Sequence, residues 1–141
     1  MIILDTNVLS ECLRPTPNPS VLAWMATQPG ESLFTTTVVE AEILYGVSLL
    51  AEGARKVALA QAVSDIFAKD FAGRVIPFDR DCAKAFATVA AHRKALGQPI
   101  SQFDAMIAAA ARSRGARLAT RNVRDFAHCD IDLINPWDPR S

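Results

Sequence analysis

The sequence predicts an α/β protein, a three-layer α/β/α sandwich with a central, mainly parallel sheet of about five strands. Short apolar runs alternate with longer helical patterns in the order β-α-α-β-α-α-β-α-α-β-(α)-β, which favours parallel strands joined by right-handed crossovers. The first run, residues 1–4, is apolar without alternation, as is typical of a central strand covered on both faces. The chain has 141 residues, so we expect residues 1–141 to form one domain.

Capping residues and prolines divide the first half of the chain. Thr6 and Asn7 are good helix starters directly after the first strand. Residues 14–19 are too rich in proline to be helical, and Asn18 followed by Pro19 starts a new helix with a cap and a proline in the first position. The expected elements are a strand over residues 1–4, a helix from Thr6, a helix from Pro19 that Pro29-Gly30 ends, a strand over residues 32–36, and a helix that Thr37 and Glu40 open as a capping box.

Glycines and further caps divide the second half. Asp79 and Ser101 are expected helix caps, and Gly97 and Gly115 are expected to end the helices that they open. The helix after Ser101 is alanine-rich and almost wholly apolar, so we expect it to pack in the interior. The expected elements are a helix over residues 54–70, a strand over 74–78, helices over 79–97 and 101–115, a strand over 116–119, a helical turn from Asn122 to Asp125, and a strand over 131–134.

Composition restricts the class of protein. Half of the residues are hydrophobic and the formal net charge is zero, which argues against a disordered chain and against a histone-like binder. No apolar run approaches the roughly 20 residues of a membrane span, and the N-terminus lacks the basic region of a signal peptide. Three scattered cysteines fit reduced thiols, so we expect a cytoplasmic protein without a membrane partner. The high apolar share, with Trp24, Trp137 and alanine-rich helices, predicts a homodimer.

Polar side chains gather at one edge of the predicted sheet, outside the carboxyl ends of the strands, where ligands bind in open α/β folds. Asp5 ends the first strand, Glu42 follows the second strand, and Asp104 starts a helix; Asn122 or Asp125 follows the fourth strand. Each has a structural explanation alone, as a cap, a dipole partner or a surface residue. Together they form an acidic site without an interleaved lysine, which favours a hard divalent cation, Mg²⁺ or Mn²⁺.

The interpretation of Glu42 depends on which face of its predicted helix is apolar. Glu42 shares a stripe with Val38, Tyr45, Gly46 and Leu49, which we expect to face the interior. A buried carboxylate is unfavourable unless a cation or a donor meets it, so this stripe favours a functional role. A tilted, surface-exposed Glu42 is the alternative.

Basic residues cluster close to the predicted acidic site. Arginines at this density can bind phosphates, although a solvated helix end is a more common explanation. The five lie within thirteen residues: Arg112, Arg114, Arg117, Arg121 and Arg124.

Four blocks of the sequence resemble, in order, the blocks of PIN domains, and the resemblance covers residues 1–137. The chain is similar to VapC-type toxins and nearest to their FitB-like branch, whose ending also resembles residues 134–137. The blocks are Asp5–Asn7, Ala41–Gly46, Asp104–Ala111 and Ala119–Phe126.

The resemblance implies a PIN-like fold and a metal-dependent endoribonuclease, in which a metal-activated water attacks the RNA phosphorus in line. It implies that Asp5, Glu42 and Asp104 bind Mg²⁺ or Mn²⁺, with Asp125 or Asn122 in the fourth position. It also implies a cognate VapB- or FitA-like antitoxin, whose tail we expect to lie across the acidic site with a basic side chain among the carboxylates. Around this site we expect Thr6, Asn7 and Thr120 to orient the carboxylates, and Arg121 and Arg124 of the arginine cluster to contact RNA or a partner.

Two interpretations from other classes stay open. A phosphatase with Asp5 as the nucleophile would also place an aspartate after an apolar strand, but its usual second aspartate is Asn7 here. A non-catalytic RNA- or partner-binding module is the other interpretation, if Asn122 has silenced the site. Histidine-based RNA cleavage is disfavoured because neither His92 nor His128 falls in the four blocks.

Overall fold

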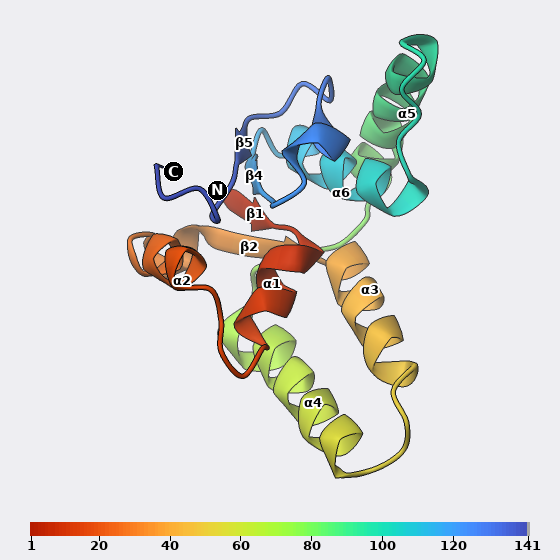
Figure 1. Ribbon diagram of the computed structural model, residues 1–141. Helices are drawn as coiled ribbons and strands as arrows, with labels where there is room; N and C mark the ends of the chain where they lie inside the picture. The colour runs from red at the N-terminus through yellow and green to blue at the C-terminus, as the bar shows by residue number, and fades with distance from the viewer. Residues whose placement is uncertain (141) are drawn as a thin grey trace.

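The fold is built on a parallel five-stranded sheet, seen here in a computed structural model that describes residues 1–140 (Figure 1). The strands stand in the order β3-β2-β1-β4-β5, and every neighbouring pair is parallel. In the central strand, Ile3 pairs with Phe34 on one side and with Leu118 on the other, and it is fully buried. The predicted central strand is therefore confirmed. The strands are β1 Ile2–Leu4, β2 Leu33–Thr36, β3 Val75–Ile76, β4 Arg117–Ala119 and β5 Leu133–Ile134.

Helices cover both faces of this sheet, which confirms the three-layer arrangement. Figure 1 shows α5 and α6 together beyond one side of the sheet and α1, α2 and α4 beyond the other, with the carboxyl end of β1 running into α1 between them. Within residues 1–140 the α-helices are α1 Thr6–Cys12, α2 Pro19–Ala26, α3 Thr37–Ser48, α4 Ala54–Asp65, α5 Arg80–Ala95 and α6 Gln102–Ser113. Shorter 3₁₀ turns span Gly30–Ser32 (η1) and Val123–Phe126 (η3), and a π-helical turn spans Ile66–Asp70 (η2).

Local side-chain caps start most of these helices. Asn18, Asp79 and Ser101 each accept a hydrogen bond from a main-chain N–H in the first turn of the helix that they precede, as predicted. The expected capping box at Thr37 is wrong by one residue, because Thr36 is the cap and its hydroxyl accepts from the N–H of Val39 at 3.1 Å. The helix expected over residues 54–70 is also interrupted, since its last turn is the π-helical η2.

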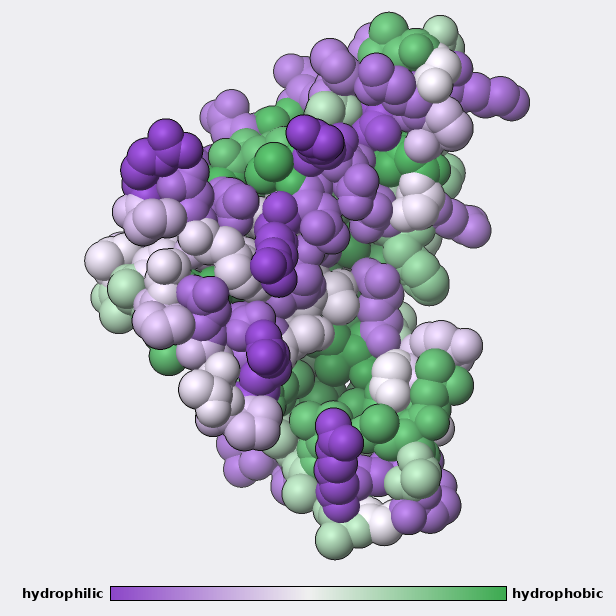
Figure 2. Space-filling model, in the orientation of Figure 1, coloured by the Kyte–Doolittle hydropathy of each residue, from purple (hydrophilic) through white to green (hydrophobic). Residues whose placement is uncertain are grey.

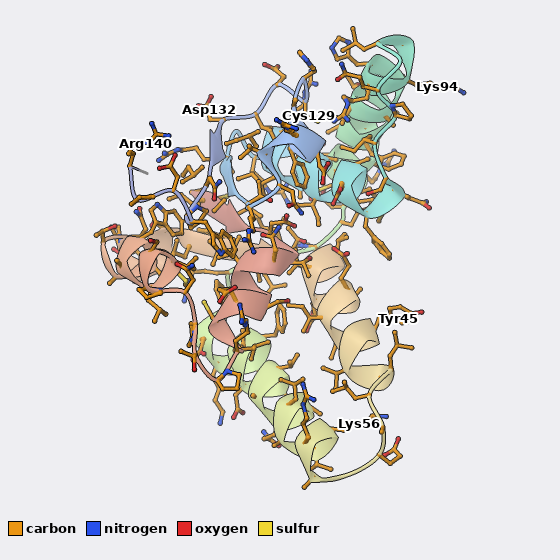
Figure 3. The ribbon with its side chains drawn as sticks, in the orientation of Figure 1. Tyr45, Lys56, Lys94, Cys129, Asp132 and Arg140 are labelled. Atoms are coloured by element: carbon orange, nitrogen blue, oxygen red, sulfur yellow. The ribbon has the colours of Figure 1, made fainter. Side chains whose placement is uncertain are left out.

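The buried face of α3 differs from the predicted stripe. Its inward residues are Val38, Val39, Ile43 and Val47, whereas Tyr45 is 65% and Leu49 is 67% exposed. Figure 3 shows Tyr45 pointing away from the body of the protein. The predicted face was wrong because α3 carries apolar residues on two adjacent faces, and packing against α1 and α4 selects the face one residue further along.

The predicted homodimer and the predicted absence of a membrane span both depend on where the apolar side chains lie. Trp24 and the alanines of α6 are buried within the core, so they cannot form the surplus apolar surface from which the homodimer was predicted. The exposed large apolar residues of α3, α4 and α6 are instead Leu44, Tyr45, Leu49, Val57 and Phe103. Among residues 1–140 no helix is both long and apolar enough to cross a membrane.

Candidate metal centre

Asp5 stands where the central strand ends and is the most deeply buried carboxylate of the site. It caps α1, accepting a hydrogen bond from the N–H of Thr6 on Oδ1 at 2.8 Å and from the hydroxyl of Thr120 on Oδ2 at 2.7 Å. Only 5% of Asp5 is exposed. Its pKa is raised to about 6, mainly by burial and also by the nearby charges of Asp104 and Glu42, while the two hydrogen bonds oppose the increase.

Glu42 reaches the same site from the second turn of α3. Its Oε1 accepts a hydrogen bond from the hydroxyl of Thr6 at 2.7 Å, which joins the residue after Asp5 to a helix 36 positions further along the chain. The side chain is half-buried, and burial raises the pKa of Glu42 above its usual value. The charge of Asp104 adds to this increase, while the bond from Thr6 opposes it.

Asp104 brings a third carboxylate from the first turn of α6. Its main-chain N–H donates to the cap Ser101 at 3.2 Å, and its own side chain is half-buried. Burial raises the pKa of Asp104 and the negative charge of Asp125 adds to the increase, whereas a hydrogen bond with Ser101 and the positive charge of Arg93 oppose it. The structure therefore brings Asp5, Glu42 and Asp104 close enough to influence one another, although they come from three different elements.

Hydroxyl and amide groups hold these carboxylates without neutralising them. The Thr120 hydroxyl donates to Asp5 and accepts from the side-chain amide of Asn7 at 3.4 Å and from the N–H of Asn122 at 3.1 Å. Asn7 in turn accepts from the N–H of Arg121 at 3.3 Å. Thr6, Asn7 and Thr120 thus lie where the sequence placed them, in contact with the acidic site or with each other.

The chemistry of this donor set fits a hard divalent cation. The candidate ligand atoms of Asp5, Glu42 and Asp104 are all carboxylate oxygens. In the part of the chain that the structure describes, no basic residue forms an ion pair with any of the three. As the side chains stand, no three acidic, histidine or cysteine residues among residues 1–140 are grouped within one coordination sphere. A cation bound by Asp5, Glu42 and Asp104 would therefore bring these side chains closer together than they stand here, and its charge would offset their mutual repulsion.

The fourth position has two exposed candidates. The helical turn expected after Asn122 is η3, but the side chain of Asn122 makes no capping hydrogen bond to it. The turn is closed instead by main-chain atoms, with the N–H of Asp125 donating to the carbonyl of Asn122 at 3.0 Å. The charge of Asp125 raises the pKa of Asp104, which places the Asp125 carboxylate near the site, and the N–H of Asn122 donates to Thr120 at 3.1 Å.

Arg93 is a residue that sequence reasoning missed. It is only 6% exposed, and its Nη1 donates to the main-chain carbonyls of Asp125 at 2.7 Å and Ala127 at 3.1 Å. Its Nε donates to the carbonyl of Gln98 at 2.7 Å, so the guanidinium ties the end of α5 to the segment that carries Asp125. One signal was available: Arg93 continues the spacing of Cys82 and Val89, the buried face of α5.

Residues 2–131 match the PIN domain family. The chain is a PIN domain. It is 37% identical to the VapC ribonuclease Y4jK of Sinorhizobium fredii, over 99% of this chain and 99% of the relative. It is 38% identical to toxin FitB of Neisseria gonorrhoeae, over 97% of this chain and 99% of the relative. The crystal structure of FitAcB from Neisseria gonorrhoeae superposes with a TM-score of 0.91 at 38% identity, over 98% of this chain and 99% of that chain.

These matches confirm the resemblance that the four sequence blocks predicted. In this PIN domain, Asp5, Glu42 and Asp104 each come from a different one of the first three blocks. The fold brings these blocks to the carboxyl edge of the sheet, because β1, β2 and β4 run in the same direction.

Proposed function

We propose that this PIN domain is an endoribonuclease toxin that hydrolyses RNA phosphodiester bonds with the aid of Mg²⁺ or Mn²⁺. The observation that carries the proposal is the set formed by Asp5, Glu42 and Asp104, whose pKa values are raised and which no basic residue among residues 1–140 pairs with. The full-length similarity to a VapC ribonuclease and to toxin FitB supports RNA as the substrate.

In this proposal Asp5, Glu42 and Asp104 hold the cation, with Asp125 or Asn122 in the fourth position. A bound divalent cation supplies an acidified water and stabilises negative charge on the phosphate. The chain's own contribution is orientation: the hydroxyl of Thr120 fixes one oxygen of Asp5, and the hydroxyl of Thr6 fixes one oxygen of Glu42. Each carboxylate keeps further lone pairs for a ligand.

The test is cleavage of single-stranded RNA by protein purified without a partner. We expect cleavage with Mn²⁺ or Mg²⁺ and none with EDTA, and Asp104→Asn should lower the rate at least ~10²-fold because a few kcal/mol of charge stabilisation is lost. Arg117→Ala is a matched control, since Arg117 is exposed at the start of β4, at the opposite edge of the sheet. Full activity of Asp104→Asn, or of the wild type in EDTA, would overturn the mechanism.

We further propose that an antitoxin inhibits the enzyme. Solved structures similar to this chain include FitAcB of Neisseria gonorrhoeae and VapBC2 of Rickettsia felis, the latter bound to promoter DNA. An open groove of about 540 Å³ runs between α1, α3 and α4, and Figure 2 shows apolar surface in this hollow with hydrophilic residues around it. Its lining includes Leu13, Ile43, Val47, Ala58 and Leu59, which suits the apolar face of an antitoxin helix.

The antitoxin proposal has its own test. The protein co-purified with the product of the adjacent gene should lack ribonuclease activity, because a basic side chain of the antitoxin tail pairs with the carboxylates. Leu59→Asp, which places a charge in the groove, should weaken the complex while free enzyme activity stays unchanged. An equally active complex would refute inhibition, and an unweakened Leu59→Asp complex would refute the groove.

The two alternative interpretations are less well supported. Asn7 stands where a phosphatase needs its second aspartate, and its amide is engaged with Thr120 and with the N–H of Arg121. A non-catalytic binding module would bind RNA in the cleavage assay but leave it intact with every metal.

A further inference from the structure

Arg121 lies at the edge of the candidate metal centre because its main chain is tied to it. The N–H of Arg121 donates to Oδ1 of Asn7 at 3.3 Å, and the amide of Asn7 donates to Thr120 at 3.4 Å. Thr120 donates in turn to Asp5 at 2.7 Å. Three consecutive hydrogen bonds therefore fix the position of Arg121 relative to the most buried carboxylate.

The side chain of Arg121 rests on Trp137. The strand β5 ends with Ile134 beside Ala119 of β4, so the segment after β5 follows the same edge of the sheet as Arg121. A tight turn then brings Trp137 back, with its N–H donating to Oδ1 of Asn135 at 3.0 Å. The guanidinium carbon of Arg121 lies 5.2 Å from the centre of the Trp137 ring, a cation–π contact between residues of two different strand ends.

This contact gives the guanidinium of Arg121 a fixed support on a chain segment whose main chain is tied to the acidic site. Arg121 is exposed, and within residues 1–140 it forms no ion pair with any carboxylate. The half-buried Trp137 ring is anchored on the core and supports one face of the guanidinium. The N–H groups at the edge of a guanidinium are the donors that bind phosphate, and a guanidinium already held in place loses less entropy when it does so.

We propose that Arg121, held by Trp137, is a subsite for a backbone phosphate of the RNA strand beside the scissile bond. This inference rests on the proposed ribonuclease function. In it Arg121 is the phosphate-binding group and Trp137 is a positioning residue. Arg121 forms no ion pair with Asp5, Glu42 or Asp104 among residues 1–140, so its guanidinium is available for a phosphate.

Binding of a short single-stranded RNA in EDTA tests the subsite without cleavage. Arg121→Ala should weaken binding about tenfold and reduce the slope of log Kd against log salt by about 0.7, the value for one phosphate contact on a single strand. Arg121→Lys should keep the slope but bind more weakly than the wild type, because a lysine does not lie flat on the indole. Arg117→Ala, the same change at the opposite edge of the sheet, should bind like the wild type.

The role of Trp137 is tested by a pair of variants and by its fluorescence. Trp137→Phe should stay near the wild-type affinity, Trp137→Leu should weaken binding several-fold, and the double variant of Arg121→Ala and Trp137→Leu should be no weaker than Arg121→Ala alone. In Trp24→Phe, Trp137 is the only tryptophan of the chain, so its emission should change when RNA binds. Circular dichroism checks that each variant is folded.

Three outcomes would overturn the subsite. They are an unchanged affinity and salt slope for Arg121→Ala, additive losses in the double variant, and competition by inorganic phosphate as strong as by the oligonucleotide, which would show a general anion site. Failure of the proposed function is distinguishable, since the wild type would then bind RNA in EDTA yet not cleave it with Mn²⁺. If it does cleave, Arg121→Ala should raise KM and leave kcat nearly unchanged.

Discussion

Replacement of Asp5 by asparagine should stabilise the metal-free protein at neutral pH although it removes a carboxylate that we propose as a metal ligand. Asp5 is almost fully buried, and its pKa of about 6 in the folded protein lies above the ordinary value of 3.8. The folded state therefore holds this proton more tightly than the unfolded state does. It follows that the free energy of unfolding falls as the pH rises from about 4 to about 6 and stays low above that range.

The size of the effect follows from the same pKa values. The difference between 3.8 and about 6 corresponds to about 3 kcal/mol of unfolding free energy at neutral pH. The asparagine cannot accept both hydrogen bonds that Thr6 and Thr120 give to Asp5, and one lost bond costs about 1 kcal/mol. We therefore expect Asp5→Asn to gain about 1–2 kcal/mol, or roughly 3–8 °C in Tm.

Calorimetry in EDTA at pH 7.5 and at pH 4.5 measures this gain. At pH 4.5 Asp5 of the wild type is largely protonated, so the advantage of Asp5→Asn should disappear. Mn²⁺ should raise the Tm of the wild type at pH 7.5 and raise that of Asp5→Asn much less. Asp132→Asn is the control, because Asp132 is exposed before β5 and its replacement should leave the Tm unchanged. A less stable Asp5→Asn at pH 7.5, or an equal gain at both pH values, would refute the reasoning.

Four other predictions concern neighbouring features. In Mn²⁺ titrations of cleavage, Asp125→Asn should lower activity about tenfold more than Asn122→Ala; the reverse ranking would assign the fourth position to the amide. Thr6→Val removes the hydroxyl that lowers the pKa of Glu42, so the rise of activity with pH should shift to higher pH. Thr6→Ser keeps the hydroxyl and should leave the pH profile unchanged. Arg93→Met leaves three main-chain carbonyls without their donor and should lower the unfolding free energy by roughly 3 kcal/mol in urea, with partial rescue in Arg93→Lys. Light scattering should give twice the chain mass at micromolar concentration, and Tyr45→Asp should reduce it if the exposed face of α3 forms the interface.

The parts of the fold that depend on neighbouring residues could be predicted from the sequence. The caps at Asn18, Asp79 and Ser101 are such features, because a side chain and an N–H two or three residues away decide them. The buried face of α3 could not, because its helix has two adjacent apolar faces and only contact with α1 and α4 chooses between them. The π-helical turn of η2 has no local sequence signal either.

The same division applies to the site. That Asp5 and Asp104 lie close together could be predicted from the sequence, because Asp5 ends an apolar strand and Asp104 opens an apolar helix at the same edge of a parallel sheet. Arg93 and the contact of Arg121 with Trp137 could not be found in this way. They depend on contacts between residues 32 and 16 positions apart, Arg93 with Asp125 and Arg121 with Trp137. The helical spacing of Arg93 with Cys82 and Val89 indicates a buried position, but it does not indicate which segment Arg93 binds.

The donors around the carboxylates explain why stability and the proposed activity should oppose each other in the metal-free protein. Thr6 and Thr120 orient Glu42 and Asp5 through hydroxyls, which fix direction but add no positive charge. A lysine or arginine at either position would lower the pKa values and stabilise the fold, but it would also occupy the oxygens that a cation needs. Arg121 rests on the ring of Trp137 and forms no ion pair with these carboxylates among residues 1–140. These contacts therefore leave the carboxylates negatively charged and repelling one another. A cation that binds them, whether a metal ion or a basic side chain of an antitoxin, relieves this repulsion and so stabilises the folded protein.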